Sequence, residues 1–84
     1  MRFAVTPRFE RRARRLTPAQ RVMLRAALRR FAADPQDPLL RTHELPGARK
    51  GHWAFAVDDD LRVLFRRDGD LAILVLVGTH DEVY

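Results

Sequence analysis

The hydrophobic positions along the chain repeat with two different periods, which divide it into strand and helix segments. Apolar and polar residues alternate over residues 2–6, a pattern typical of a strand at or near a sheet edge. Two segments that begin at Thr6-Pro7 and Thr17-Pro18 then carry apolar residues at helical spacing. In each, the threonine is a suitable N-cap and the proline suits the first helical position, and Asp34-Pro35 ends the second segment. The sequence therefore predicts one strand followed by a hairpin of two antiparallel helices.

The second half of the chain has the pattern of three consecutive strands. Residues 35–51 form a loop by composition, with several prolines and glycines. Residues 52–57 and residues 61–67 then alternate between two faces, and residues 71–77 are nearly all apolar. Such an apolar strand is typical of the centre of a sheet that is covered on both faces, so we expect residues 71–77 there. Asp68-Gly69, between the last two segments, predicts a hairpin turn.

The order of these elements, β-α-α-β-β-β, gives α+β as the expected fold class. We expect the last three strands to form an antiparallel sheet that the first strand joins, with the helical hairpin packed on one face. A chain of 84 residues has enough surface for one core, and no linker or internal repeat interrupts it. Residues 1–84 are therefore expected to form a single domain.

The charge of the chain adds information about partners. Sixteen basic residues, fifteen of them arginine, stand against eleven acidic ones and give a net charge of +5. Residues 1–42 hold 11 Arg and 3 acidic residues (+8), whereas residues 43–84 hold 5 basic and 8 acidic residues (−3). A basic excess on a small domain favours a polyanionic partner, either nucleic acid or an acidic protein, although solvated arginine-rich helices would give the same balance.

The composition excludes several classes of protein and site. The chain has no cysteine, so disulfides and Cys-ligated zinc or iron–sulfur sites are excluded, and it has no serine for a Ser–His–Asp triad. It also lacks a glycine-rich phosphate loop. Its longest apolar run has seven residues, against roughly 20 needed to span a bilayer, and the N-terminus has no apolar signal segment. We therefore expect a cytoplasmic protein without membrane contact.

Side chains near the ends of the predicted strands are the candidates for chemistry. His43 lies in the loop before the sheet and His80 follows the last strand, so the two can form a proton-transfer pair, although solvent exposure is the simpler interpretation of each. Arg62 can hold a phosphate or occupy an ordinary strand position, and Tyr84 can stack on a base or merely pack. The aspartates at 58–60 are more simply turn residues than a metal site, because adjacent carboxylates point in different directions.

Three motifs resemble the RelE/ParE superfamily of bacterial toxins. They are L-P-G at residues 45–47, L-R-V-L-F at residues 61–65 and V-G-T-H-D-E-V-Y at residues 77–84, in the same order of elements. The spacing agrees without a gap from His43 to His80, and the YafQ-like members are the most similar. The resemblance implies a ribosome-dependent mRNA endoribonuclease that a cognate antitoxin neutralises and that requires no metal or cofactor.

The resemblance also implies roles for individual residues. The catalytic positions of the family correspond to His43 in the loop, Asp60 in the turn, Arg62 on a strand and His80 after the last strand. His80 would be the general acid, with His43 or Asp60 as the base or its orienting partner. Arg62 would stabilise the phosphorane.

Further residues would bind the substrate, with Arg49 and Lys50 assisting Arg62 and Tyr84 lying near the RNA. The basic helices would contact ribosomal RNA through phosphates.

Two departures from the family pattern leave other functions open. Ala56 and Ala54 stand where YafQ-like toxins have a histidine and an aspartate, and His52 is not at either position. The ParE branch poisons DNA gyrase without cutting RNA, but a gyrase inhibitor needs no histidine and aspartate set. A non-catalytic module that only binds an antitoxin or RNA is the third reading, which the two alanines favour.

Overall fold

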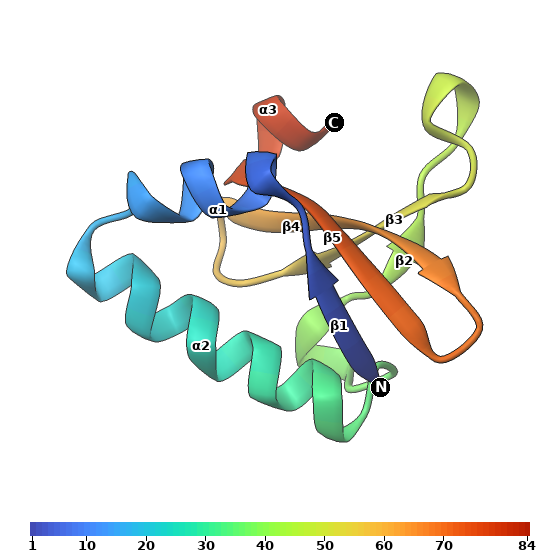
Figure 1. Cartoon of the computed structure of the whole chain (residues 1–84), viewed down its shortest axis with the longest axis horizontal. Coiled ribbons are helices and arrows are strands. Elements are labelled where there is room, and N and C mark those ends of the chain that lie inside the picture. Colours follow the sequence, from blue (N-terminus) through green and yellow to red (C-terminus); the bar gives the residue numbers. More distant parts are fainter.

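A five-stranded sheet forms the centre of the computed structural model, which describes residues 1–84. Its strands lie in the order β1-β5-β4-β3-β2 (Figure 1). Their bounds are Arg2–Val5 (β1), His43–Glu44 (β2), His52–Ala56 (β3), Leu61–Asp68 (β4) and Leu71–Thr79 (β5). The predicted α+β order is confirmed, with the two-residue strand β2 added inside the segment predicted as a loop. The apolar strand β5 is an interior strand as expected, but β4 occupies the middle of the sheet.

Strand β1 is the one departure from the predicted antiparallel sheet, because it runs parallel to β5. Its edge position is confirmed, and its residues are exposed. Thr6 fixes the direction of the chain at the end of this strand. Its hydroxyl donates to the carbonyl of Leu74 on β5 at 2.9 Å and accepts the backbone N–H of Phe9 at 3.2 Å. The first helix therefore begins directly at the edge of the sheet.

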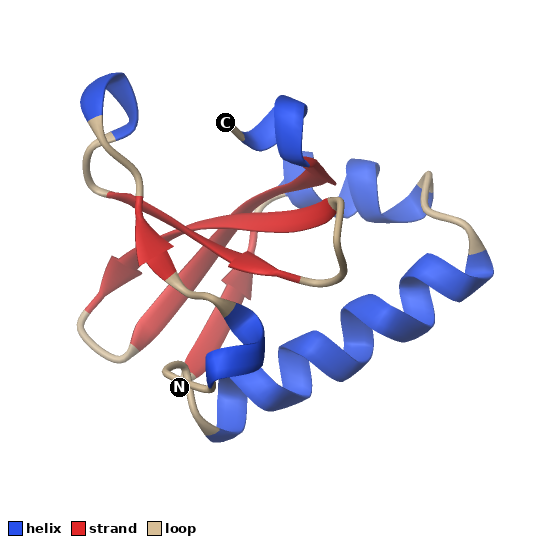
Figure 2. Cartoon of the chain, turned by 180° about the vertical axis from the view of Figure 1, so that it is seen from behind, coloured by secondary structure: helices blue, strands red, loops and turns tan.

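The two predicted helices are present as α1 (Pro7–Arg14) and α2 (Pro18–Ala33). Both begin as predicted, with Thr6 and Thr17 as N-caps and a proline in the first turn. The helices diverge from the turn between them, and Figure 2 shows α2 running alongside the sheet as a separate layer. None of the helices combines the length and the hydrophobicity needed to cross a bilayer.

The main core lies between these helices and one face of the sheet. Phe31 of α2 is fully buried at its centre and contacts three other rings. Its ring centroid lies 4.7 Å from that of Phe55 on β3, 4.9 Å from that of Phe65 on β4 and 6.0 Å from that of Phe3 on β1. The predicted alternation in β3 and β4 is present, and it places their phenylalanines toward the helices.

The opposite face of the sheet has a smaller core and is only partly covered. Five buried residues form it: Leu45, Ala54, Leu64, Leu76 and Val83. The last of these belongs to a single helical turn, α3 (His80–Val83), which the sequence pattern predicted only as a short tail. Two 3-10 turns, η1 (Pro38–Leu40) and η2 (Gly47–Arg49), lie in the segment that leads to β3.

Removing the ring of Phe31 is expected to cost most of the stability of the fold. Truncation of a fully buried phenylalanine costs about 3–5 kcal/mol, because the cavity adds to the lost burial. We expect this loss for Phe31→Ala in chemical denaturation, and a change near zero for Val22→Ala, since Val22 lies on the same helix but is 60% exposed. Equal losses in the two variants would contradict the central role of Phe31. Should Phe31→Ala not fold, Phe31→Leu gives the same comparison with a smaller loss.

Candidate active site

Arg62 lies near the start of β4, the middle strand, on the sheet face that the two long helices leave open. It lies on β4 opposite Ala56 of β3 and Gly78 of β5, and it is only 8% exposed. Its Nη1 donates to the carbonyls of Asp58 and Leu61, and its Nη2 donates to the carbonyl of Asp59 at 3.1 Å. These bonds engage three of the five guanidinium N–H groups.

Arg62 and the side chain of Asp58 together hold the acidic turn between β3 and β4 in place. Asp58 Oδ1 accepts the backbone N–H groups of Asp60 at 2.9 Å and Leu61 at 2.6 Å. This is the turn role that the sequence favoured for the aspartates. No group of three or more His, Asp or Glu side chains lies close enough together to hold a metal ion.

Helix α3 brings the two C-terminal candidates to this face. Thr79 is its N-cap, and Glu82 closes a capping box with it. Val83 is fully buried under the turn, and Asp60 Oδ1 accepts the backbone N–H of His80 at 3.4 Å. The turn after β3 and the turn after β5 are therefore connected, and His80 lies beside Asp60.

His43, Tyr84 and His80 form a row of three aromatic rings next to Arg62. Strand β2 pairs His43 with Ala54, which places it on the open face. The Tyr84 hydroxyl lies 3.1 Å from His43 Nε2, and the two rings stack with centroids 5.6 Å apart. On its other side the Tyr84 ring lies 4.4 Å from the imidazole of His80.

The hydrogen bonds assign the protons of this row. His43 Nδ1 lies 2.8 Å from the carbonyl of Arg41, and because a carbonyl only accepts, Nδ1 carries the proton. In the tautomer that carries only this proton, Nε2 is an acceptor to which the Tyr84 hydroxyl donates. Burial raises the pKa of Tyr84 above its ordinary value of 10.0, and the positive charge of nearby Arg62 opposes this shift. Tyr84 is consequently a neutral phenol, hence a proton donor, at physiological pH.

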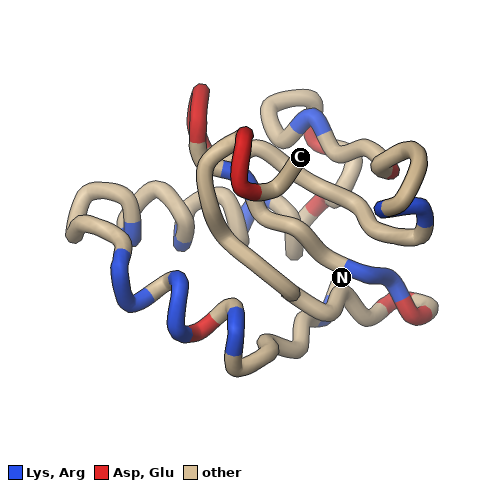
Figure 3. The backbone as a smooth tube through the Cα atoms, turned by 90° about the horizontal axis from the view of Figure 1, so that it is seen from above, with Lys and Arg blue, Asp and Glu red and all other residues tan.

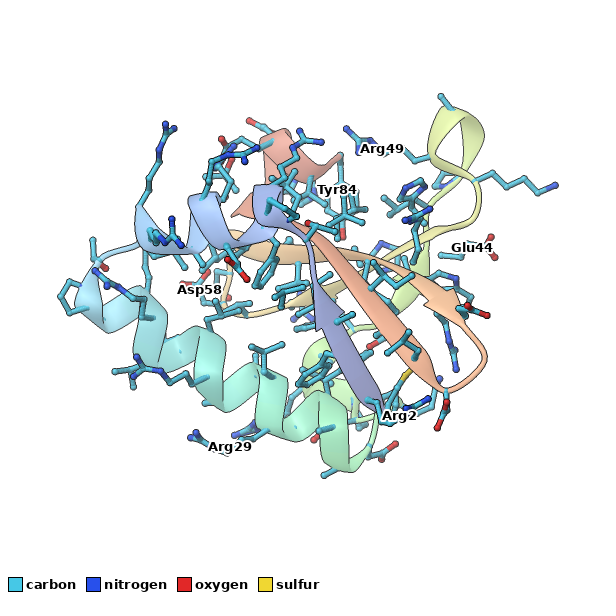
Figure 4. All side chains as sticks on the ribbon, in the orientation of Figure 1. Arg2, Arg29, Glu44, Arg49, Asp58 and Tyr84 are labelled. Atoms are coloured by element: carbon cyan, nitrogen blue, oxygen red, sulfur yellow. The ribbon has the colours of Figure 1, made fainter.

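Of the two basic loop residues assigned to substrate binding, only Arg49 reaches this row. Arg49 and Tyr84 line one hollow of about 320 Å³ whose other walls are Leu45, Pro46 and Ala48. Figure 4 shows the Arg49 side chain pointing from η2 toward α3 and Tyr84. Lys50 lines a different hollow with Glu44, so the structure separates the two cations.

The structure thus brings together five of the seven predicted residues and adds others that sequence reasoning missed. His43, Asp60, Arg62, His80 and Tyr84 meet at one patch, with Arg49 at its border. Among the missed residues, Arg41 has a left-handed backbone (φ 51°) that directs its carbonyl at His43, a feature without a sequence signal.

Glu82 and Arg12 form an ion pair beside the patch, and both were missed. The Thr79-x-x-Glu82 pattern could have revealed the first, since it is that of a capping box. Nothing in the sequence distinguishes Arg12 from the other arginines of its helix. Figure 3 shows basic positions recurring along α1 and α2, with the acidic ones mostly in turns and in α3.

Comparisons with known proteins find no matching family model and no matching curated protein, but they do find solved structures. YafQ from E. coli BL21(DE3) aligns with a TM-score of 0.77 at 16% identity, covering 100% of this chain and 99% of that chain. A YoeB/ParE toxin from Agrobacterium tumefaciens aligns with a TM-score of 0.74 at 19% identity, covering 95% and 99%. The chain has the RelE/ParE toxin fold. YafQ in the E. coli DinJ–YafQ complex shares this RelE/ParE fold with a TM-score of 0.70 at 18% identity, covering 100% and 99%.

Acid is expected to loosen α3. The pKa of Glu82 lies below its ordinary value of 4.5, first because its carboxylate accepts the backbone N–H of Thr79 and also because Arg12 donates to it. A carboxyl group with a lowered pKa stabilises the folded state above its ordinary pKa, and this contribution is lost as pH falls through the lowered value. NMR titration should show Glu82 protonating below pH 4.5 together with a shift of the Thr79 amide. The midpoint should rise in Arg12→Gln, and an unchanged midpoint would exclude a contribution from Arg12.

Proposed function

We propose that this protein is a toxin of a type II toxin–antitoxin system that cuts mRNA on the ribosome. Two observations support the proposal. The fold is that of YafQ and of a YoeB/ParE toxin. On the open face of that fold, two imidazoles, a carboxylate, a guanidinium and a phenol come together from four separate elements, and this convergence carries the proposal.

The proposed reaction is cleavage of RNA through its own 2′-hydroxyl, which needs a base and an acid but no metal. The base removes the proton of the 2′-hydroxyl, and the freed oxygen attacks the adjacent phosphorus. The bond from phosphorus to the 5′-oxygen then breaks, and the acid protonates the departing oxygen. The products are a 2′,3′-cyclic phosphate and a 5′-hydroxyl.

We assign His43 as the base and His80 as the acid, because their rings lie on either side of Tyr84. His43 suits the role of base, since its Nδ1 proton is held by the Arg41 carbonyl and its Nε2 accepts. Asp60 orients His80 through the backbone N–H at the start of α3. General acid and base catalysis each contribute about 10²–10⁴-fold in enzymes.

Arg62 would stabilise the charge that develops on the phosphorane. A guanidinium held by three carbonyls is fixed in position before substrate binds, and stabilisation by such preorganised groups requires little reorganisation. Its two remaining N–H donors would face the phosphate oxygens. Arg49 at the border of the patch would contact a neighbouring phosphate, whereas Lys50 lines another hollow, with Glu44.

The proposed partners are mRNA, the ribosome and an antitoxin protein. YafQ has been solved with DinJ, which supports a cognate antitoxin for this chain as well. The arginines along α1 and α2, apart from Arg12, which is paired with Glu82, would contact ribosomal RNA phosphates. This binding should weaken as salt rises. An antitoxin that competes for the same surface would be acidic in the segment that covers it.

Replacing His80 is expected to abolish cleavage without unfolding the protein. Its side chain is exposed, so His80→Ala should keep the circular dichroism spectrum and melting temperature of the native chain. Loss of the acid should lower the cleavage rate of mRNA on translating ribosomes by about 10²–10⁴-fold. The measurement is mapping of RNA 5′ ends after induction, with His52→Ala as a control histidine outside the patch. Undiminished cutting by folded His80→Ala would remove His80 from the reaction.

Replacing Arg62 with lysine tests whether Arg62 contacts a phosphate through its planar guanidinium or only supplies positive charge. Arg62→Lys keeps the charge but loses the planar fork, so cleavage should fall at least about tenfold. Arg66→Lys, on the exposed end of the same strand, should cut like the native protein. Both variants are compared at a temperature at which both are folded, because Arg62 also holds the acidic turn. Equal rates would assign the effect of Arg62 to charge alone.

A non-catalytic RNA- or antitoxin-binding module is the second candidate function. The structure places Ala54 and Ala56 on the same face as Arg62, so the strand beside the guanidinium offers no polar side chain of its own there. A module of this kind would bind ribosomes and antitoxin without producing new 5′ ends. A gyrase supercoiling assay run in parallel distinguishes the mRNA endoribonuclease and the non-catalytic module from a ParE-type inhibitor. Such an inhibitor would block supercoiling and leave mRNA intact.

A further inference from the structure

Helix α3 carries two of the proposed site residues but is too short to be stable alone. It has four residues, and isolated helices shorter than about 12 residues are marginal in water. His80 is the first residue of α3 and Tyr84 is its C-cap, and their ring centroids lie 4.4 Å apart. The position of these rings therefore depends on contacts that α3 makes with the rest of the protein.

Glu82 makes the contact that reaches furthest along the chain. Its Oε1 accepts the backbone N–H of Thr79 at 2.9 Å and closes the capping box, while its Oε2 accepts from Arg12 Nη2 of α1. The two carboxylate oxygens thus have separate partners, one inside α3 and one 70 positions away. An ion pair of this kind joins the last turn of the chain to its first helix.

Gly78 shows how closely the three elements approach. A side-chain carbon at this position would lie 3.0 Å from Glu82 Oε1 and 3.3 Å from Arg12 Nη2, both closer than ordinary van der Waals contact. Its φ is not in the left-handed region, so space and not backbone conformation calls for glycine here. The end of β5 thus leaves room for the Arg12–Glu82 pair directly beside Arg62, which pairs with Gly78 across the sheet.

We propose that Arg12 is a positioning residue for His80 and Tyr84, acting through Glu82, and that α1 thereby sets the geometry of the reaction. The cleavage test of this inference rests on the proposed function, whereas the NMR test of the ring positions does not. Arg12 differs in this respect from Arg14, whose ion pair with Glu10 lies within α1 at 3.8 Å and holds nothing beyond the helix.

Single-turnover cleavage of mRNA on programmed ribosomes gives the first test. We expect Arg12→Gln to lower the rate at saturating protein about three- to tenfold while the half-saturating concentration stays unchanged, because misplaced groups slow the reaction of bound RNA. Glu82→Gln should behave alike, since its amide oxygen still accepts from Thr79. The double variant should be no slower than either single one, because both remove the same contact.

The matched control is Arg2→Gln, which removes an arginine from another ion pair, with Asp70, away from α3. It should cut like the native protein. A rise in the half-saturating concentration of Arg12→Gln with an unchanged saturated rate would overturn the proposal, because Arg12 would then be an RNA contact. Additive losses in the double variant would also overturn it.

An NMR measurement on the protein alone keeps the inference separate from the proposed function. Nuclear Overhauser contacts between the rings of Tyr84 and His80, and between Tyr84 and His43, should weaken in Arg12→Gln and persist in Arg2→Gln. If the native protein cuts no RNA but these contacts weaken, the proposed function fails and the positioning role stands. If the contacts are the same in Arg12→Gln and the native protein, the positioning role fails whatever the cleavage result.

Discussion

The packing of Phe31 against the phenylalanines of β3 and β4 is the constraint on which the rest of the structure depends. It fixes α2 across one face of the sheet, and α1 follows because the turn before α2 is short. With both long helices on this face, the other face has only the η2 loop and one helical turn to cover it. Polar groups can therefore gather on that face without being buried under a third layer.

The polar patch results from strand order rather than from proximity in the chain. His43 precedes β3, Arg62 lies within β4 and His80 follows β5, and these three strands are neighbours. The buried guanidinium holds the turn that supplies Asp60, and Asp60 in turn holds the start of α3. Each group of the patch is therefore positioned by another member of it. Removal of one is expected to disturb its neighbours, so the energies of these residues will not add.

The local pattern was sufficient for most of the fold and for little of the site. The Thr-Pro helix starts, the alternation of β3 and β4 and the hairpin after β4 are local signals, and all were confirmed. The turn itself lies one residue later than predicted, at Gly69 and Asp70. The parallel direction of β1 has no local signal in the sequence, because it depends on the path that the chain takes through α1 after Thr6. Helix α3 could not be foreseen from propensity, since a helix of four residues is too short to be stable without contacts to the rest of the protein. The residues of the patch were predicted from the resemblance to a toxin family. Arg12 and Arg41 were missed, because their contacts with Glu82 and His43 depend on the fold and leave no motif in the sequence.

The bond between Tyr84 and His43 bears on how the proposed reaction begins. In the free protein the accepting nitrogen of His43 is occupied by the phenol, so a 2′-hydroxyl must displace Tyr84 before His43 can remove its proton. Exchange of one neutral hydrogen bond costs about 0.5–1.5 kcal/mol, which is small beside the roughly 7–11 kcal/mol that correct orientation of reacting groups can supply. RNA that is free in solution has no such orientation, whereas mRNA held by the ribosome does. Under the proposed function, orientation of the mRNA would therefore matter far more to the rate than the small cost of displacing Tyr84 from His43.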